Sequence, residues 1–127
     1  VAQRKLLPIT TCKQLSDLIS RVKRKVKSNI HPATQVFMTL RMAVNLEREN
    51  IISLMDLAPQ LLNSNGLLGV ITFHSTEDKL VKEEIEKLVS KNIVSVINKK
   101  PIEPSIEELK ISPRTRSAKL RFVQKHI

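Results

Sequence analysis

One stretch decides the fold of this 127-residue chain: Leu67-Leu68-Gly69-Val70-Ile71-Thr72-Phe73-His74-Ser75-Thr76-Glu77-Asp78. Its apolar first half predicts a buried strand over residues 67–73, and its polar second half predicts the start of a helix. Ser75 suits the N-cap, and Asp78 suits its capping-box partner. In open α/β sheets, ligands bind beyond the carboxyl ends of strands, where helix N-termini point. The stretch is therefore either a candidate site around His74 and Ser75 or an ordinary, well-capped turn.

The pattern on both sides of this stretch predicts the remaining elements. Upstream, apolar residues at helical spacing predict three helices: one that follows a Thr11–Gln14 capping box, one that starts at His31-Pro32, and one over 47–62 with a kink or break at Pro59. Downstream, the sequence predicts a helix over 76–90, strands over 93–97 and 118–124, a short helix opened by Ser105 with Glu108, and a basic loop over 112–117.

The net charge of +10 gathers at the two ends of the chain. Residues 1–27 and the segment from Lys110 onward are strongly basic, whereas 28–109 is slightly acidic. This distribution favours a polyanion partner, most often nucleic acid, and the alternative is a solvated basic surface. Trp and Tyr are absent, and we expect the three phenylalanines, Phe37, Phe73 and Phe122, in the core. Stacking on single-stranded bases is therefore not expected to be the main source of affinity.

Several classes of protein are disfavoured by what the sequence lacks. No apolar run is long enough to cross a membrane, and no signal peptide is recognisable. Cys12 is the sole cysteine, which fits a reducing, cytoplasmic setting, and no metal site is expected. The only glycines are Gly66 and Gly69, and no glycine-rich nucleotide or cofactor loop is present. The start at Val1 suggests a fragment or a trimmed chain.

Three segments hold candidate functional residues. His31 is either a local cap or a contact to a phosphate or base. His74 is well placed to hydrogen-bond a substrate or to relay a proton, although no acidic residue close in sequence obviously orients it. Arg114 and Arg116 are placed either to bind phosphate or to pair with acidic residues of the same region, namely Glu103, Glu107 and Glu108.

Four segments, in this order, resemble the signatures of one family. Residues 31–45 (HPATQVFMTLRMAVN) resemble H-P-A-T-R-x-F-Q-A-L-R-I-x-V-N, and 70–82 (VITFHSTEDKLVK) resemble V-I-S-F-H-S-L-E-D-R-I-V-K. Residues 100–105 (KPIEPS) and 113–121 (PRTRSAKLR) match K-P-I-x-P-S and P-R-S-R-S-A-K-L-R. The family is MraW, the S-adenosylmethionine-dependent small-subunit rRNA (cytosine-N4) methyltransferases. Departures are small: Gln35, Met38 and Thr76 replace the usual Arg, Gln and Leu.

The resemblance implies an α/β fold, the C-terminal part of a Rossmann-like (class I) methyltransferase sheet preceded by helices of an inserted helical domain. Residues 1–45 would be the later part of that insertion, on the RNA side, and 46–127 the C-terminal part of the methyltransferase domain. The family's S-adenosylmethionine loop lies upstream, so no cofactor-binding residue is carried over. We expect the isolated chain to be inactive and not to bind S-adenosylmethionine.

The resemblance also implies methyl transfer to N4 of a cytidine in small-subunit (16S) rRNA, in the cytoplasm. The catalytic candidates are His74 and Ser75. The RNA-binding candidates are Lys23, Arg24, Lys27, His31, Arg41, Asn45, Arg114, Arg116 and Lys119. Further partners are the missing N-terminal half or a second copy of the chain, because strand 67–73 is left with an unpaired apolar edge. The competing interpretation is a non-enzymatic, basic RNA-binding remnant.

Overall fold

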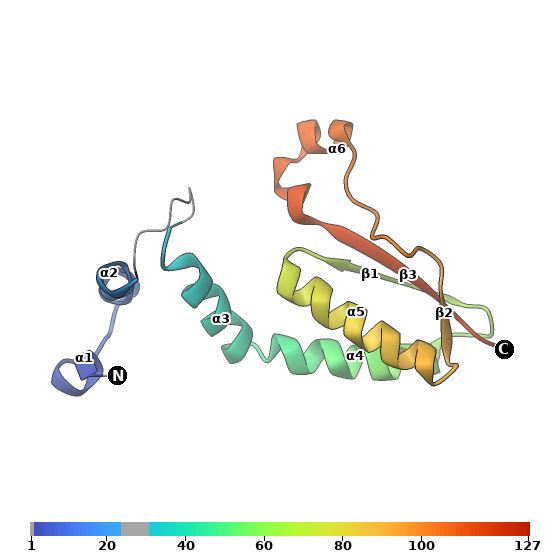
Figure 1. Ribbon diagram of the computed structural model, residues 1–127, viewed down its shortest axis with the longest axis horizontal. Helices are drawn as coiled ribbons and strands as arrows, with labels where there is room; N and C mark the ends of the chain where they lie inside the picture. The colour runs from blue at the N-terminus through green and yellow to red at the C-terminus, as the bar shows by residue number, and fades with distance from the viewer. Residues whose placement is uncertain (1, 24–30) are drawn as a thin grey trace. The chain divides into compact units, whose positions relative to one another are not determined.

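A computed structural model describes residues 2–23 and 31–127, and the chain divides into two compact units, 1–45 and 46–127 (Figure 1). The described part of the first unit consists of helices α1 (Ala2–Leu6), α2 (Cys12–Val22) and α3 (Thr34–Val44). The Thr11–Gln14 capping box that opens α2 is confirmed. Helix α1 was not predicted, and α3 begins at Thr34 rather than at His31-Pro32.

The second unit contains all the strands of the described chain. Its elements are α4 (Glu47–Leu61), β1 (Leu67–Thr72), α5 (Ser75–Ser90), β2 (Val94–Val96), α6 (Ile106–Ile111), the 3-10 helix η1 (Pro113–Ser117) and β3 (Lys119–Lys125). The Ser105–Glu108 capping box of α6 is confirmed. The basic segment after Ser112 forms η1 rather than the expected loop. Of the kink or break expected at Pro59, the break is not found, because α4 continues to Leu61.

The three strands form one sheet in the order β1-β3-β2, and β3 is antiparallel to both neighbours. Strands β1 and β2 therefore run in the same direction and are joined through helix α5, which is the connection that α/β proteins use between parallel strands. In the β1–β3 pairing, Leu67 is opposite Gln124 and Thr72 is opposite Lys119. Among the described residues, β1 is an edge strand with β3 on one side only.

One face of the sheet is covered, and the hydrophobic core lies there. Helix α5 packs against β1, β2 and α4 (Figure 1). The buried cluster takes residues from four elements: Met55, Val81, Ile85, Leu88, Val94 and Val123. Because side chains alternate along a strand, Leu68 and Val70 of β1 point to this covered face and pack against the cluster.

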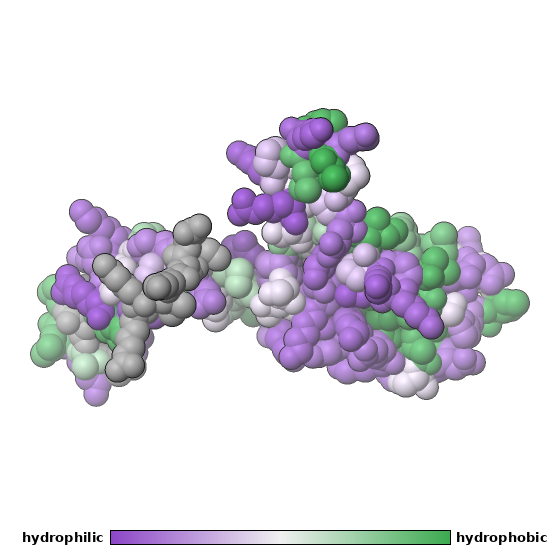
Figure 2. Space-filling model, turned by 45° about the horizontal axis from the view of Figure 1, so that its top comes forward, coloured by the Kyte–Doolittle hydropathy of each residue, from purple (hydrophilic) through white to green (hydrophobic). Residues whose placement is uncertain are grey.

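The opposite face of the sheet, which we call the open face, carries apolar side chains without a cover among the described residues. Leu67, Ile71 and Phe73 are each more than half exposed. The register places Leu120 and Phe122 of β3 beside Ile71 and Gly69 on the same face. The ring of Phe122 lies so close to Gly69 that a β-carbon there would come within 2.6 Å of its edge. Figure 2 shows apolar patches on the surface of this unit.

Candidate functional site at the carboxyl end of β1

His74 is the residue that caps α5. Its backbone is extended (φ −146°, ψ 158°), and its Nδ1 accepts a hydrogen bond from the backbone N–H of Glu77 at 3.2 Å. The prediction of Ser75 as N-cap with Asp78 as its partner is therefore wrong by one residue, because Ser75 is already helical. The imidazole does here what a Ser or Asp side chain does at most N-caps.

Glu77 completes this cap in the reverse direction. Its Oε2 accepts the backbone N–H of Phe73 at 3.0 Å, and its Oε1 lies 3.0 Å from Nε2 of His74. Since Nδ1 of His74 accepts an N–H, the neutral ring carries its hydrogen on Nε2 and donates it to Glu77. Sequence reasoning missed this acid. The signal was the spacing His-x-x-Glu, which becomes visible once the helix is started one residue earlier.

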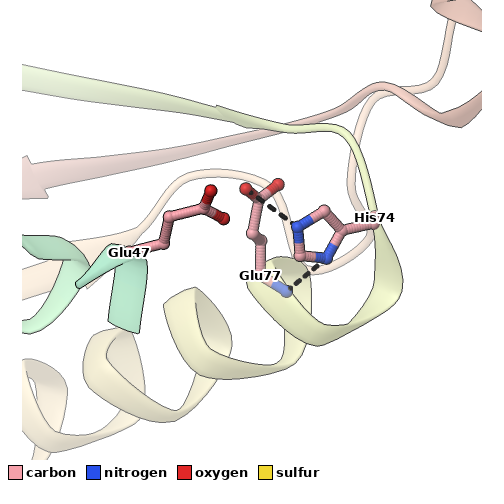
Figure 3. Close-up of side chains that lie close together, drawn as sticks. All are labelled: Glu47, His74 and Glu77. Atoms are coloured by element: carbon pink, nitrogen blue, oxygen red, sulfur yellow. Dashed lines mark hydrogen bonds and ion pairs between the residues drawn. The ribbon is translucent and has the colours of Figure 1, made fainter. Parts of the chain in front are cut away.

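A second carboxylate, from Glu47, lies beside this pair. Figure 3 shows Glu47, the first residue of α4, directed toward Glu77 and His74, and the nearest ligand-type atoms of the three residues lie within 4.8 Å of one another. The preceding residue, Leu46, has a left-handed backbone (φ 52°) that a bulky side chain adopts only at a cost. The cluster brings together two helix N-termini, where negative charge is favoured.

The hydrogen bonds of His74 argue against a metal centre at this cluster. A metal at Nε2 needs the lone pair of that nitrogen, and the ring hydrogen then has to sit on Nδ1. In the structure Nδ1 faces a backbone N–H, so this change would abolish the cap. The described geometry therefore fits a polar helix cap, in which both ring nitrogens of His74 are engaged.

Asp78 belongs to a different contact from the one predicted. Its carboxylate receives two hydrogen bonds from Arg121, from Nε at 2.8 Å and from Nη2 at 3.1 Å, and Lys119 Nζ lies 3.6 Å away. The hydrogen bonds from Arg121 are the main reason that the pKa of Asp78 lies below its ordinary value of 3.8. This ion pair fixes the first turn of α5 on β3.

Ser75, at the start of α5, and the ring of Phe73 are exposed at the end of β1. The expectation that all three phenylalanines lie in the core is wrong: none of them belongs to the buried cluster, and Phe73 has an exposed fraction of 57%. The reason is strand alternation. Residues 67, 69 and 71 point to the open face, and residue 73 follows them in the same phase.

The basic candidates of the second unit are arranged in two ways. Arg114 and Arg116 are exposed on η1, and no ion pair joins them to Glu103, Glu107 or Glu108 among the described residues. Glu108 instead accepts the Ser105 N–H at 2.7 Å. Of the two alternatives for these arginines, internal pairing is therefore not found. Lys119 differs from them because it forms an ion pair with Asp78.

The candidates of the first unit hold local structure. Lys23 Nζ donates to Gln35 Oε1 at 2.7 Å, so Gln35, which stands where the family has Arg, is the partner of a basic residue. His31 Nδ1 accepts the Ala33 N–H at 3.2 Å, a local contact just before α3, whose own N-cap is Ala33 and has no side-chain cap hydrogen bond. Arg41 and Asn45 lie one turn apart at the end of α3. The candidates Arg24 and Lys27 lie outside the described residues.

Comparison with known proteins confirms the resemblance. The model of the MraW methylase family matches residues 1–126, so this chain belongs to that family. Three curated relatives carry the name Ribosomal RNA small subunit methyltransferase H. The protein of a Cyanothece species is 44% identical over 93% of this chain, that of Wolbachia pipientis 43% over 96%, and that of Borrelia turicatae 41% over 96%. The aligned regions are only 39%, 40% and 41% of the relatives.

The chain thus spans about two fifths of the length of these relatives. None of the described helices combines the length and the apolar character that crossing a membrane requires. The candidate residues fall into a set in the first unit and a set around the carboxyl end of β1.

Proposed function

We propose that this chain is the C-terminal part of an enzyme that transfers a methyl group from S-adenosylmethionine to N4 of a cytidine in small-subunit rRNA, in the cytoplasm. The observation that carries the proposal is the family match over residues 1–126, together with relatives named as rRNA small-subunit methyltransferases. In this proposal, residues 46–127 are the end of a Rossmann-like domain and 1–45 are part of a helical insertion. The β1-α5-β2 connection supports an α/β sheet.

The residues present do not fit S-adenosylmethionine. Gly66 lies in the turn that precedes β1, where its N–H donates to the Asn63 carbonyl, and Gly69 lies inside β1 against Phe122. Neither glycine stands in a loop that opens a helix, which is the arrangement that cradles a nucleotide-like cofactor. We therefore assign the described residues to the substrate side, and no step of methyl transfer is derived for them.

The contribution of the chain is to shape the rim on which the target nucleotide is held. Chemistry on N4 requires the base to be out of its stack and its amino group to be aligned. The capped end of β1 supplies a rigid edge with Ser75 exposed, and the Asp78–Arg121 ion pair fixes that edge on the sheet. Arg114 and Arg116 supply positive charge for rRNA phosphates.

Two measurements test this proposal. Calorimetric titration of the 127-residue chain with S-adenosylmethionine should show no binding, and micromolar affinity would contradict the assignment to the substrate side. Coexpression with the preceding part of the Cyanothece relative should restore methylation of small-subunit rRNA. In this experiment Asp78→Asn should weaken the restored activity. The matched control is Glu86→Gln, at an exposed ion pair, which should leave the activity unchanged.

A second candidate, a non-enzymatic RNA-binding protein, is favoured by the net charge of +10 and by the exposed arginines of η1. The coexpression experiment separates the two. RNA binding by the chain without restored methylation would support the RNA-binding protein, and restored methylation would support the enzyme.

A further inference from the structure

Phe73 is the exposed aromatic residue of this chain. Of the three aromatic side chains, Phe37 and Phe122 are partly buried, whereas 57% of Phe73 is exposed. An exposed aromatic ring lowers the solubility of a protein, but it offers a flat apolar surface on which a planar ligand can stack.

The backbone beneath the ring of Phe73 is fixed. Its N–H donates to Glu77 Oε2, and the following residue, His74, caps α5 through Nδ1. On the strand side, Thr72 is paired with Lys119 in the sheet and is buried. The side chain is therefore presented from a rigid turn, so a ligand that stacks on it does not have to order the backbone first.

The ring lies at the same end of the sheet as two exposed arginines. The register pairs Thr72 with Lys119, so the end of β1 lies beside the start of β3, and η1 with Arg114 and Arg116 leads directly into β3 (Figure 1). An aromatic platform beside positive charge is the combination with which proteins hold single-stranded nucleic acid, since the ring stacks on a base and the cations bind phosphates.

We infer that Phe73 is a nucleotide-binding residue: its ring stacks on an unpaired base of the RNA while Arg114 and Arg116 hold the adjacent phosphates. This inference rests on the proposed function and names the group that holds the target nucleotide at the rim. The other possible cover for the ring is polypeptide, because Phe73 continues the apolar open face of the sheet. The pair of arginines at this end of the sheet favours RNA over polypeptide.

The composition of the chain makes the test direct. It contains no Trp and no Tyr, so Phe73→Trp introduces a single fluorophore at the proposed platform. The variant is titrated with a short single-stranded RNA that has a central cytidine, and with the same RNA carrying an abasic site at that position. We expect strong quenching by the cytidine RNA and little by the abasic RNA. Ile71→Trp, at an equally exposed position on the open face, should report no such difference.

Affinity gives an independent readout. Stacking on one base predicts that Phe73→Leu weakens binding of the cytidine RNA by about 5- to 100-fold, whereas Phe73→Tyr retains it. Leu keeps the apolar cover that a protein contact needs, so unchanged affinity in Phe73→Leu would overturn the inference and point to a polypeptide cover. Equal quenching by both RNAs, or absence of RNA binding by the wild-type chain, would also overturn it. Circular dichroism confirms that each variant is folded.

The two proposals fail separately. Restored methylation in the coexpression experiment, combined with no base-dependent quenching, would retain the methyltransferase and discard the stacking role of Phe73. Base-dependent quenching without restored methylation would retain the stacking role and discard the enzyme.

Discussion

On the covered face of the sheet, Val94 and Val123 are almost completely buried beneath the helices, whereas on the open face Leu67 and Ile71 are more than half exposed. The two faces belong to the same strands and carry residues of the same type. What distinguishes them is that α4 and α5 pack on one side of the sheet, and no described residue covers the other.

This difference separates what stabilises the second unit from what remains available for contact. The covered face supplies the core and the Asp78–Arg121 ion pair. The open face and the edge of β1 supply apolar surface that a partner, a second copy or the rest of a longer chain can bury. Phe73 lies where the open face meets the carboxyl end of β1. We propose that the RNA binds at this end of the strand.

The largest effect is expected from a matched pair of isoleucines. Ile85→Ala removes a buried side chain of α5 and should lower the free energy of unfolding by about 2–5 kcal/mol. Ile71→Ala on the open face should lower it by about 0.5 kcal/mol or less. Urea unfolding at several protein concentrations measures both. Equal losses would mean that the open face is buried in solution.

The ion pair between α5 and β3 should give the next largest effect. Asp78→Asn leaves Arg121 without its charged partner and should lower the free energy of unfolding by about 1–3 kcal/mol. Glu86→Gln is the control, since its pair with Lys82 is exposed and should contribute about 0.5 kcal/mol or less.

The same pair predicts a dependence on pH. The pKa of Asp78 is lower in the folded chain than its ordinary value of 3.8, so its stabilisation is fully present above that value. It is lost as the pH falls through the lowered folded pKa. The difference in stability between the wild type and Asp78→Asn should therefore shrink in acid, as measured by unfolding at pH 7 and at low pH. A constant difference would show that the pair is not ionic.

Substitutions at the cap of α5 should have a smaller effect on stability, and this effect should differ between the adjacent residues His74 and Ser75. His74→Ala removes the acceptor of the Glu77 N–H and should cost about 0.5–2 kcal/mol of stability. Ser75→Ala should change it by about 0.5 kcal/mol or less, because Ser75 is inside the helix. Thermal unfolding of both variants is the measurement, and the opposite order would restore Ser75 as the cap.

The smallest effect on stability is expected at the edge strand. Ile71→Lys places a charge on the open face and should change the free energy of unfolding by about 0.5 kcal/mol or less. It should nevertheless reduce any concentration-dependent association seen by sedimentation, because charge on an edge strand opposes pairing between copies. Thr76→Lys, on an exposed position of α5, should leave association unchanged.

Local patterns in the sequence predicted most of the elements of the second unit. A short apolar run placed β1, alternating residues placed β3, and the Ser105–Glu108 spacing placed the start of α6. The errors have local causes as well. His74 was not considered as a cap, although its Nδ1 is a good acceptor, and this moved the start of α5 by one residue and hid Glu77.

The candidate site was predicted only in part. The position at the end of β1 followed from the strand-to-helix transition, but the contacts of its side chains did not. Asp78 was read as a partner within its own helix, and the structure pairs it with Arg121, 43 residues away. Such a contact depends on which strands are neighbours in the sheet, and local sequence patterns do not predict the order of the strands.

The sequence by itself determined the family, most of the helices and strands of the second unit, and the basic character of both ends, because each of these depends on residues close together in the chain. Only the tertiary structure decided that β3 lies between β1 and β2, that Glu47 meets His74 and Glu77, and that Phe73 is exposed. Burial is decided by what packs on a side chain from elsewhere in the fold, so the same apolar pattern gave a core on one face and an open surface on the other.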